Sequence, residues 1–291
     1  MADIDYTQVF GLHSIPAAVI FTVLYIPLLL WFVVQSVRNT TYVYIVLTVF
    51  CLMRIGAFVL RAILIGINSL HNSLNTFIVD QVLFGVGFFA LLYSAYTLVL
   101  DREIVMNGDA MSKPSSYAEA TSRQPLIIRL TRNRHLFRIA LMVAVALGVS
   151  GITSSTSSNP DKVETGSHLR KASTILFIVL TAIQALQTAL AFRDSRAQGY
   201  HHRHGASAAG AFGNRHGTYL LVLISLLLII REVFLVAVIN DASRQNNEAF
   251  WYPFVALTEL LAVCCYAVPG LVPPRAEVKR RTRDVETLGM R

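Results

Sequence analysis

The chain has 291 residues, of which 54% are hydrophobic and only 14% are charged. An average soluble domain is about half apolar and about a quarter charged, so this composition, with a mean hydropathy of +0.55, excludes an ordinary soluble domain and predicts a protein of the lipid bilayer. The formal net charge is +8, but the basic residues lie mainly between apolar stretches, which argues against nucleic acid as a partner and is typical of charges that orient a membrane protein.

Seven stretches are long and apolar enough to cross a hydrocarbon core of about 30 Å, which needs about 20 helical residues. In chain order they cover residues 15–37, 42–65, 77–100, 136–153, 171–192, 218–239 and 251–272. The first contains Pro27, which we expect to kink the helix. The fourth is short and runs into a Ser-rich loop that ends at Asn159 and Pro160. The sequence predicts an all-α fold, a seven-transmembrane-helix bundle over residues 15–272.

Basic residues divide unequally between the two sides of these spans. Only Lys162, Arg170 and Arg244 lie on the side of the N-terminus, whereas the opposite side carries most of the others. Basic loops stay in the cytosol, so residues 1–14 are expected outside or in the lumen and the basic tail 273–291 in the cytosol. We expect an integral, multi-pass protein of the plasma membrane or the endoplasmic reticulum.

Neither a metal site nor a cofactor is predicted. The three cysteines all lie in apolar stretches, unlike those of a disulfide framework or a zinc site. A Gly- and Ala-rich segment holds a cluster of histidines, namely His201, His202, His204 and His216. It lacks the cysteine or carboxylate partners that a good metal site needs.

Six ionisable residues lie inside the predicted spans. They are Arg54 and Arg61 in the second, Asp80 in the third, Arg231 and Glu232 in the sixth, and Glu259 in the seventh. An uncompensated charge at a helix centre costs about 2.5–3.5 kcal/mol on insertion scales, so six together would exceed the stability of a typical fold. The three cations and three anions therefore have to compensate one another.

The topology, with a rise of about 1.5 Å per residue, predicts the depth of each charge. Arg61 and Asp80 fall at similar depth near the outer edge, where they can pair. The others lie deeper, and we expect Arg231 to pair with Glu259 and Glu232 with Arg54. Such a polar ladder either fixes the rotation of the helices or lines a route for a ligand or an ion.

Other polar residues fall near the same outer end. A ring around the mouth of a pocket is predicted from Asn68, His71, Asn72, Asn75 and Gln81. Gln184 and Gln187 lie one turn apart on the fifth span. They either face the pocket or form hydrogen bonds to a neighbouring helix, and the second interpretation is favoured.

The last two spans, "LLLIIREVFLVAVI" and "EAFWYPFVALTELLAVCCYAVPGLVPP", carry an arginine in the middle of span six, an acidic residue in span seven and a closing Pro-Gly. With "CLMRIGAFVLRA" in span two, they resemble an uncharacterised fungal family of seven-span integral membrane proteins, and more distantly the fungal lipid-translocating exporter family. Where that exporter family is expected to have a second arginine, this chain has Leu235. The resemblance implies a lipid-like ligand.

The favoured hypothesis is binding or transport of a small amphipathic, lipid-like molecule in an outward-opening pocket with apolar walls. The predicted ligand-binding residues are the six buried charges. Arg54, Arg61 and Arg231 would hold the head group. Asp80, Glu232 and Glu259 would position these arginines or relay a proton.

Two alternatives remain open. A membrane-embedded terpene cyclase of a fungal secondary-metabolite pathway would use Glu259 or Glu232 as the general acid, with Asp80 as a second carboxylate. Its cationic intermediates would be stabilised by aromatic rings, namely Phe88, Phe89, Tyr93 and Tyr96. Carboxylates paired with arginine make poor proton donors, so an enzyme is the less favoured reading.

A seven-helix receptor is the other alternative. Asp101, Arg102 and Glu103 at the end of span three are similar to the acidic-Arg motif of G-protein-coupled receptors, although span seven has no NPxxY-like sequence. A retinal protein is excluded, because span seven has no lysine for a Schiff base.

Overall fold

The structure is a computed structural model, and it describes residues 14–67, 74–107, 133–155, 159–198, 212–241, 244–245 and 247–280. Over these ranges all regular secondary structure is helical, and seven spans are long and apolar enough to cross a membrane. The spans are α2 (Ile15–Arg38), α3 (Tyr42–Gly66), α4 (Leu74–Asn107), α7 (Arg134–Ser155), α8 (Pro160–Gln198), α9 (Phe212–Ala237) and a seventh made of α11 (Glu248–Trp251), η3 (Tyr252–Ala256) and α12 (Leu257–Tyr266). The predicted all-α, seven-helix membrane fold is confirmed.

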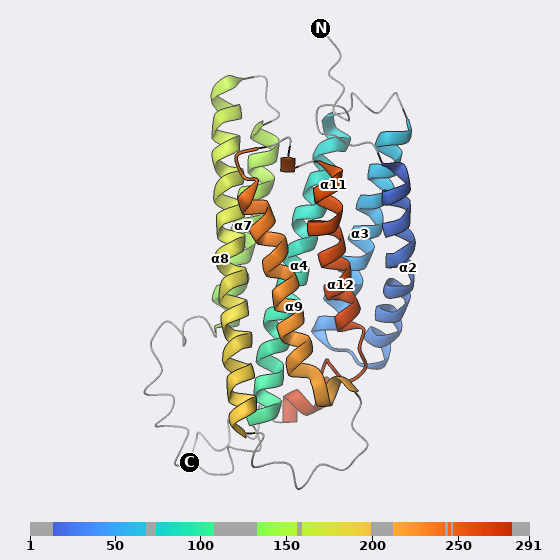
Figure 1. Ribbon diagram of the computed structural model, residues 1–291, viewed down its shortest axis with the longest axis vertical. Coiled ribbons are helices and arrows are strands. Elements are labelled where there is room, and N and C mark those ends of the chain that lie inside the picture. Colours follow the sequence, from blue (N-terminus) through green and yellow to red (C-terminus); the bar gives the residue numbers. More distant parts are fainter. Residues whose placement is uncertain are drawn as a thin grey trace.

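The spans form an up-and-down bundle in which each helix packs against its neighbours in sequence (Figure 1). α12 also touches α2, and α4 contacts α8 and α9 as well as its neighbours α3 and α7. As a result α4 is the most enclosed span: 67% of its most apolar stretch is buried, against 22% in α2. From Ala90 to Arg102 every residue of α4 is buried.

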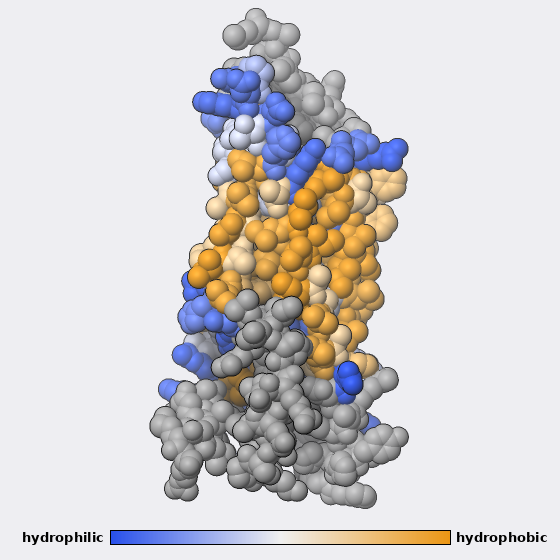
Figure 2. Space-filling view, turned by 90° about the vertical axis from the view of Figure 1, so that its left-hand side faces the viewer, coloured by the Kyte–Doolittle hydropathy of each residue, from blue (hydrophilic) through white to orange (hydrophobic). Residues whose placement is uncertain are grey.

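The outer surface of the bundle is apolar. Figure 2 shows a broad hydrophobic belt across the middle of one face, with hydrophilic residues gathered above it. Large aliphatic side chains are exposed on the outside of several spans, among them Ile20 and Leu30 of α2, Leu52 of α3, Ile175 of α8 and Leu226 of α9. Lipid is the solvent that such a surface requires.

The first and last spans are joined at the upper end in Figure 1. Ser14 caps α2, because its Oγ accepts a hydrogen bond from the N–H of Ala17 at 3.3 Å. The Ser14 N–H donates to Glu248 Oε2 at the start of α11, at 2.7 Å. One residue thus begins the first helix and fixes it to the seventh.

Helix α8 begins well before the expected Lys171. Asn159 is its N-cap, with its side-chain oxygen accepting from the N–H of Asp161 at 3.0 Å, and Pro160 is the first helical residue. The helix therefore starts with three polar turns before its apolar stretch, and the hydropathy of the sequence marked only the apolar stretch. The seventh span ends at Tyr266 rather than at Val272, before a turn in which Gly270 has a φ of 83°.

Small residues let α7 and α8 approach closely. A Cβ on Gly151 would lie 2.8 Å from the backbone nitrogen of Arg170, and a Cβ on Gly166 would lie 2.8 Å from the carbonyl oxygen of Gly151. Ser173 Oγ donates across the same interface to the carbonyl of Ala144 at 2.7 Å. Close backbone contact and interhelical hydrogen bonds are what hold helices together in lipid.

We predict that Gly166→Ala destabilises the protein by about 1–3 kcal/mol, because the added methyl group overlaps backbone atoms that have no room to move. Gly56 on α3 is the matched control, since a Cβ there would meet nothing within 4 Å. Gly56→Ala is expected to be neutral or to stabilise by up to about 1 kcal/mol. Thermal unfolding in detergent micelles measures both, and equal melting temperatures for the two variants would contradict the close packing of α7 on α8.

Candidate functional site

An ion pair joins α3 and α4 in the upper half of the bundle. Arg61 Nη2 lies 2.9 Å from Asp80 Oδ2, and both side chains are buried. The Arg61 guanidinium also lies over two aromatic rings, 4.5 Å from the centroid of Phe84 and 4.0 Å from that of Trp251. The predicted Arg61–Asp80 pair is present, and it is surrounded by aromatic side chains that exclude lipid.

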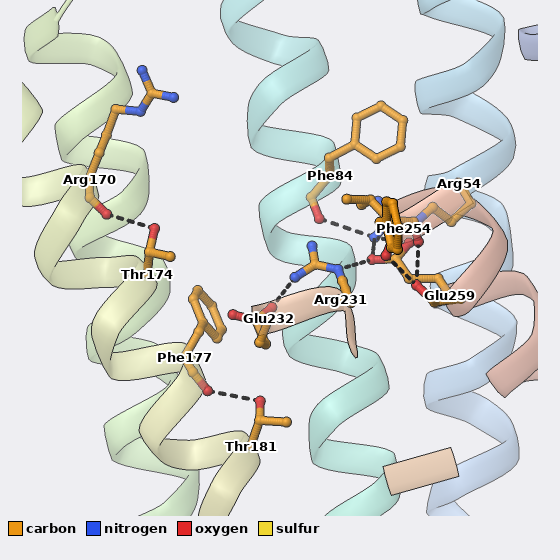
Figure 3. Close-up of polar contacts among 12 residues, drawn as sticks. Arg54, Phe84, Arg170, Thr174, Phe177, Thr181, Arg231, Glu232, Phe254 and Glu259 are labelled. Atoms are coloured by element: carbon orange, nitrogen blue, oxygen red, sulfur yellow. Dashed lines mark hydrogen bonds and ion pairs between the residues drawn. The ribbon is translucent and has the colours of Figure 1, made fainter. Parts of the chain in front are cut away.

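A larger cluster lies one layer deeper and centres on Glu259 of α12. This carboxylate accepts from Arg54 Nη2 of α3 at 2.7 Å and from Arg231 Nε of α9 at 2.7 Å. Arg231 turns its Nη1 to Glu232 of its own helix, so Figure 3 shows Arg231 between the two glutamates. The expected Arg231–Glu259 pair is present.

The expected pairing of Glu232 with Arg54 was wrong. Arg54 pairs with Glu259 instead, and Glu232 pairs with the adjacent Arg231. Depth along the helices allowed either arrangement, but the rotation of each helix about its axis decides between them. Glu259 therefore serves two arginines from two different helices.

Arg54 is fully buried and also contacts the backbone of α4. Its Nη2 donates to the carbonyl of Phe84 at 3.2 Å, and its guanidinium lies 4.7 Å from the centroid of the Phe84 ring. Gly87 makes this approach possible, because a Cβ there would lie 3.0 Å from Cζ of Arg54. The Phe84 ring thus contacts both guanidinium groups, Arg54 at 4.7 Å and Arg61 at 4.5 Å from its centroid, which connects the two layers of charge.

A π-helical turn aligns the seventh span with α3. Pro253 has no N–H to donate, and in η3 the N–H of Leu257 bonds to the carbonyl of Tyr252, five residues back. Trp251 and Glu259 are eight residues apart, which in a regular α-helix would rotate them by about 80°. The π turn takes up one extra residue, which changes the angle between the two side chains by about 100° and leaves them only about 20° apart. Trp251 and Glu259 therefore both face the interior of the bundle. They meet Arg61 and Arg54, which are themselves two α-helical turns apart.

A cavity of about 140 Å³ lies beside this network, between α4, α7, α8, α9 and the seventh span. Its walls are aliphatic and aromatic, including Phe84, Phe88, Phe177 and Trp251. Arg231 and Glu232 line it, whereas Arg54, Arg61, Asp80 and Glu259 are not among its lining residues. Of the six buried charges, two therefore line the cavity and four lie outside its lining.

Two charged side chains of the cavity lining are not fully paired among the described residues. Glu232 is only 1% exposed, and its Oε2 has no hydrogen-bond partner among the residues described, while its Oε1 holds Arg231. Arg170 of α8 also lines the cavity, and no described carboxylate forms an ion pair with it. A buried carboxylate oxygen without a partner is costly, which makes it a candidate contact for a ligand.

Arg170 was missed as a site residue because it precedes the apolar stretch and was assigned to a loop. The signal that could have found it is a stripe at helical spacing along α8, which predicts one face turned to the interior. The stripe consists of Arg170, Ser173, Thr174, Phe177, Thr181, Gln184 and Thr188. Figure 3 shows Arg170 on the same helix as Phe177, at the upper end of this row.

The remaining predicted polar residues have different positions. Gln81 lines the cavity and Asn75 is exposed, while Asn68, His71 and Asn72 lie outside the described residues, as do three of the four clustered histidines. Gln184 donates to Thr188 and, across to α9, to Ser225, each at 3.0 Å. The interpretation of Gln184 as a link to a neighbouring helix is confirmed.

The aromatic residues proposed for a cyclase mostly pack between helices. Tyr96 stacks on Phe137 of α7 with ring centroids 3.8 Å apart, and Tyr93 meets Tyr42 of α3 edge-on at 5.5 Å. Phe89 stacks on Tyr93 of its own helix. Phe88 alone of the four lines the cavity, where the Arg231 guanidinium lies 3.7 Å from its centroid.

Arg102 joins helices at the opposite end of the bundle. Its Nη1 donates to the carbonyls of Gly213 at 3.2 Å and Leu271 at 2.8 Å, while the neighbouring Asp101 pairs with Arg134 at 2.6 Å. These contacts tie α4 to the start of α9, to the chain after α12 and to α7.

Glu259→Gln is predicted to destabilise the protein by about 3–5 kcal/mol, because Arg54 and Arg231 lose their shared counter-ion while remaining buried. The matched control is Glu164→Gln on the exposed start of α8, where the side chain is 78% exposed and we expect a change within about 0.5 kcal/mol. Unfolding in mixed micelles measures both. A Glu259→Gln protein as stable as the control would remove the central role of this carboxylate.

Gly87 and Gly85 of α4 offer a matched pair. A Cβ at position 87 contacts the Arg54 guanidinium, whereas one at position 85 meets nothing within 4 Å. Gly87→Ala should therefore cost about 1–3 kcal/mol, and Gly85→Ala should be neutral or slightly stabilising. The readout is the melting temperature of the two variants, and the opposite order would show that Arg54 does not occupy the space beside Gly87.

Comparison with known proteins gave no match to a family model, a curated protein or a solved structure. The resemblance of the last two spans to fungal membrane families stays a prediction, and function has to be argued from the geometry of the cavity and its charges.

Proposed function

We propose that this multi-pass membrane protein binds a small amphipathic molecule in the cavity between α4, α7, α8, α9 and the seventh span. The observation that carries the proposal is Glu232: a buried carboxylate that lines an otherwise largely apolar cavity and whose Oε2 has no hydrogen-bond partner among the described residues. Apolar walls with a few convergent polar groups are the usual composition of a small-molecule site.

The size of the cavity limits its occupant. Its volume of about 140 Å³ is close to that of the engineered cavity of about 150 Å³ that holds benzene, and below the roughly 300 Å³ of the smaller drug-sized pockets. A whole sterol or a long prenyl chain exceeds this space. The cavity suits a single ring, or the polar end of a larger amphiphile.

Binding is better supported than cyclisation. Two of the three carboxylates that a cyclase would use, Asp80 and Glu259, are held by arginines and are not in the cavity lining. Arg231 and Glu232 therefore provide polar contacts for the ligand. Their positions are held by the other four buried charges, Arg54, Arg61, Asp80 and Glu259.

The position of the cavity agrees with binding from the non-cytosolic side. Its lining includes Arg170 near the start of the apolar part of α8 and Gln245 in the connection between α9 and α11. Both lie towards the end of the bundle at which α2 begins, which the distribution of basic residues assigns to the exterior or the lumen. Below it, α4 is enclosed from Ala90 to Arg102.

Gly85→Leu tests the proposal, because Gly85 lines the cavity and a Cβ there would meet nothing within 4 Å, which leaves room for a larger side chain to occupy cavity space. Gly56→Leu places the same side chain in open space on the lipid-facing side of α3 and is the control. Each protein is purified, and its bound small molecules are identified by native mass spectrometry and solvent extraction. We expect a compound that is bound to the wild type and to Gly56→Leu and is lost from Gly85→Leu.

A second variant addresses the polar anchor. Glu232→Gln keeps the volume of the side chain but removes its charge, and should lower retention of the same compound about 10- to 100-fold, as expected for loss of a hydrogen bond to a charged group. Identical sets of bound compounds in the wild type and the folded Gly85→Leu protein would overturn the proposed function.

A further inference from the structure

The charges around the cavity do not balance. Arg54, Arg61 and Arg231 are matched by Asp80, Glu232 and Glu259, which form one connected or adjacent set of ion pairs. Arg170 is an additional cation in the cavity lining, and within the described ranges no carboxylate pairs with it. The lining is therefore one positive charge in excess.

Close packing holds Arg170 at its place. A Cβ on the facing Gly151 would lie 2.8 Å from Arg170 Cγ, so the alkyl part of the side chain lies directly on α7. The carbonyl of Arg170 accepts from Thr174 Oγ1 at 3.0 Å, one turn further along α8. The guanidinium thus extends from a fixed base on a residue that lines the cavity, and it carries five N–H donors.

We propose that the site takes a monoanion: a carboxylate or a phosphodiester bound by Arg170, with a ring-sized apolar part among Phe88, Phe177 and Trp251. A hydroxyl or other donor on the ligand would meet Glu232 Oε2. The inference rests on the proposed function, since it names the class of molecule that the same cavity binds. A guanidinium group favours such anions because its parallel N–H groups match two oxygens of one head group.

A cationic ligand fits the cavity poorly, even though its walls are aromatic. The Phe88 ring already has the Arg231 guanidinium 3.7 Å from its centroid, and the Trp251 ring has that of Arg61 at 4.0 Å. An ammonium group would therefore join an existing set of guanidinium groups, where like charges repel. A neutral ligand would leave Arg170 without a counter-ion in a largely apolar site.

Three probes of nearly equal shape test the sign of the charge: benzoate, benzyl alcohol and benzylamine. Each is titrated into the purified full-length protein in phosphatidylcholine nanodiscs, and binding is followed by calorimetry. We expect the dissociation constant of benzoate to be at least tenfold lower than that of benzyl alcohol, with benzylamine the weakest. Arg170→Gln should bring benzoate and benzyl alcohol to within about threefold of each other. The matched control Lys171→Gln removes a neighbouring charge that is not in the lining, and should keep the preference.

Nanodiscs that also contain phosphatidylglycerol identify the source of the anion. Weaker binding of benzoate in them would assign the site to the phosphodiester of a lipid with net negative charge, which phosphatidylcholine lacks, and unchanged binding would assign it to a free acid. Either result requires that benzoate binding depends on Arg170.

The two proposals fail in different ways. If the three probes bind equally well and Arg170→Gln changes nothing, the preference for a monoanion is wrong while the binding cavity stands, provided that Gly85→Leu abolishes all three signals. If no probe binds to the wild type, the cavity is not a binding site, and both proposals fall together.

Discussion

Glu259 holds guanidinium groups from two other helices, and the interior of the bundle is organised around that shared carboxylate. Without counter-ions, each charge in a hydrocarbon layer would cost several kcal/mol. Arg54 adds a contact to the α4 backbone, and Arg231 adds one to Glu232. The spans α3, α4, α9 and α12 are therefore connected by interactions that depend on direction and distance, whereas apolar packing against lipid gives helices little preference for one rotation over another.

The buried charges serve two purposes that the sequence left as alternatives. The pairs Arg61–Asp80 and Arg54–Glu259 are enclosed by aromatic rings and backbone, as expected for groups that position helices. Glu232 differs from them because it lines a cavity, and its Oε2 has no partner among the described residues. The network thus gives a rigid wall on one side of the cavity. Glu232 has one carboxylate oxygen paired with Arg231 and one without a partner among the described residues, and such a wall keeps this carboxylate in position.

Sequence reasoning predicted the number of spans and two of the ion pairs, because hydropathy and a constant rise per residue determine which charges share a depth. It did not predict which side of each helix faces inward. Glu232 and Glu259 lie at similar depth, so only their angular positions decide which of them meets Arg54. The π turn before Glu259 changes that angle within a single span. Arg170 was missed for another reason: the helix that carries it extends beyond its apolar part, and hydropathy does not detect such an extension.

The π turn at Tyr252–Ala256 adds one residue to the seventh span. A regular α-helix would bring Trp251 and Glu259 to the same inward-facing side with one residue fewer between them. Related chains can therefore keep this architecture in two forms: a tryptophan and a glutamate separated by eight positions with a π turn, or by seven positions without one. An alignment that penalises gaps inside membrane helices would shift one of the two residues off its counterpart. Relatives of this chain are best sought with a one-residue gap allowed between Trp251 and Glu259.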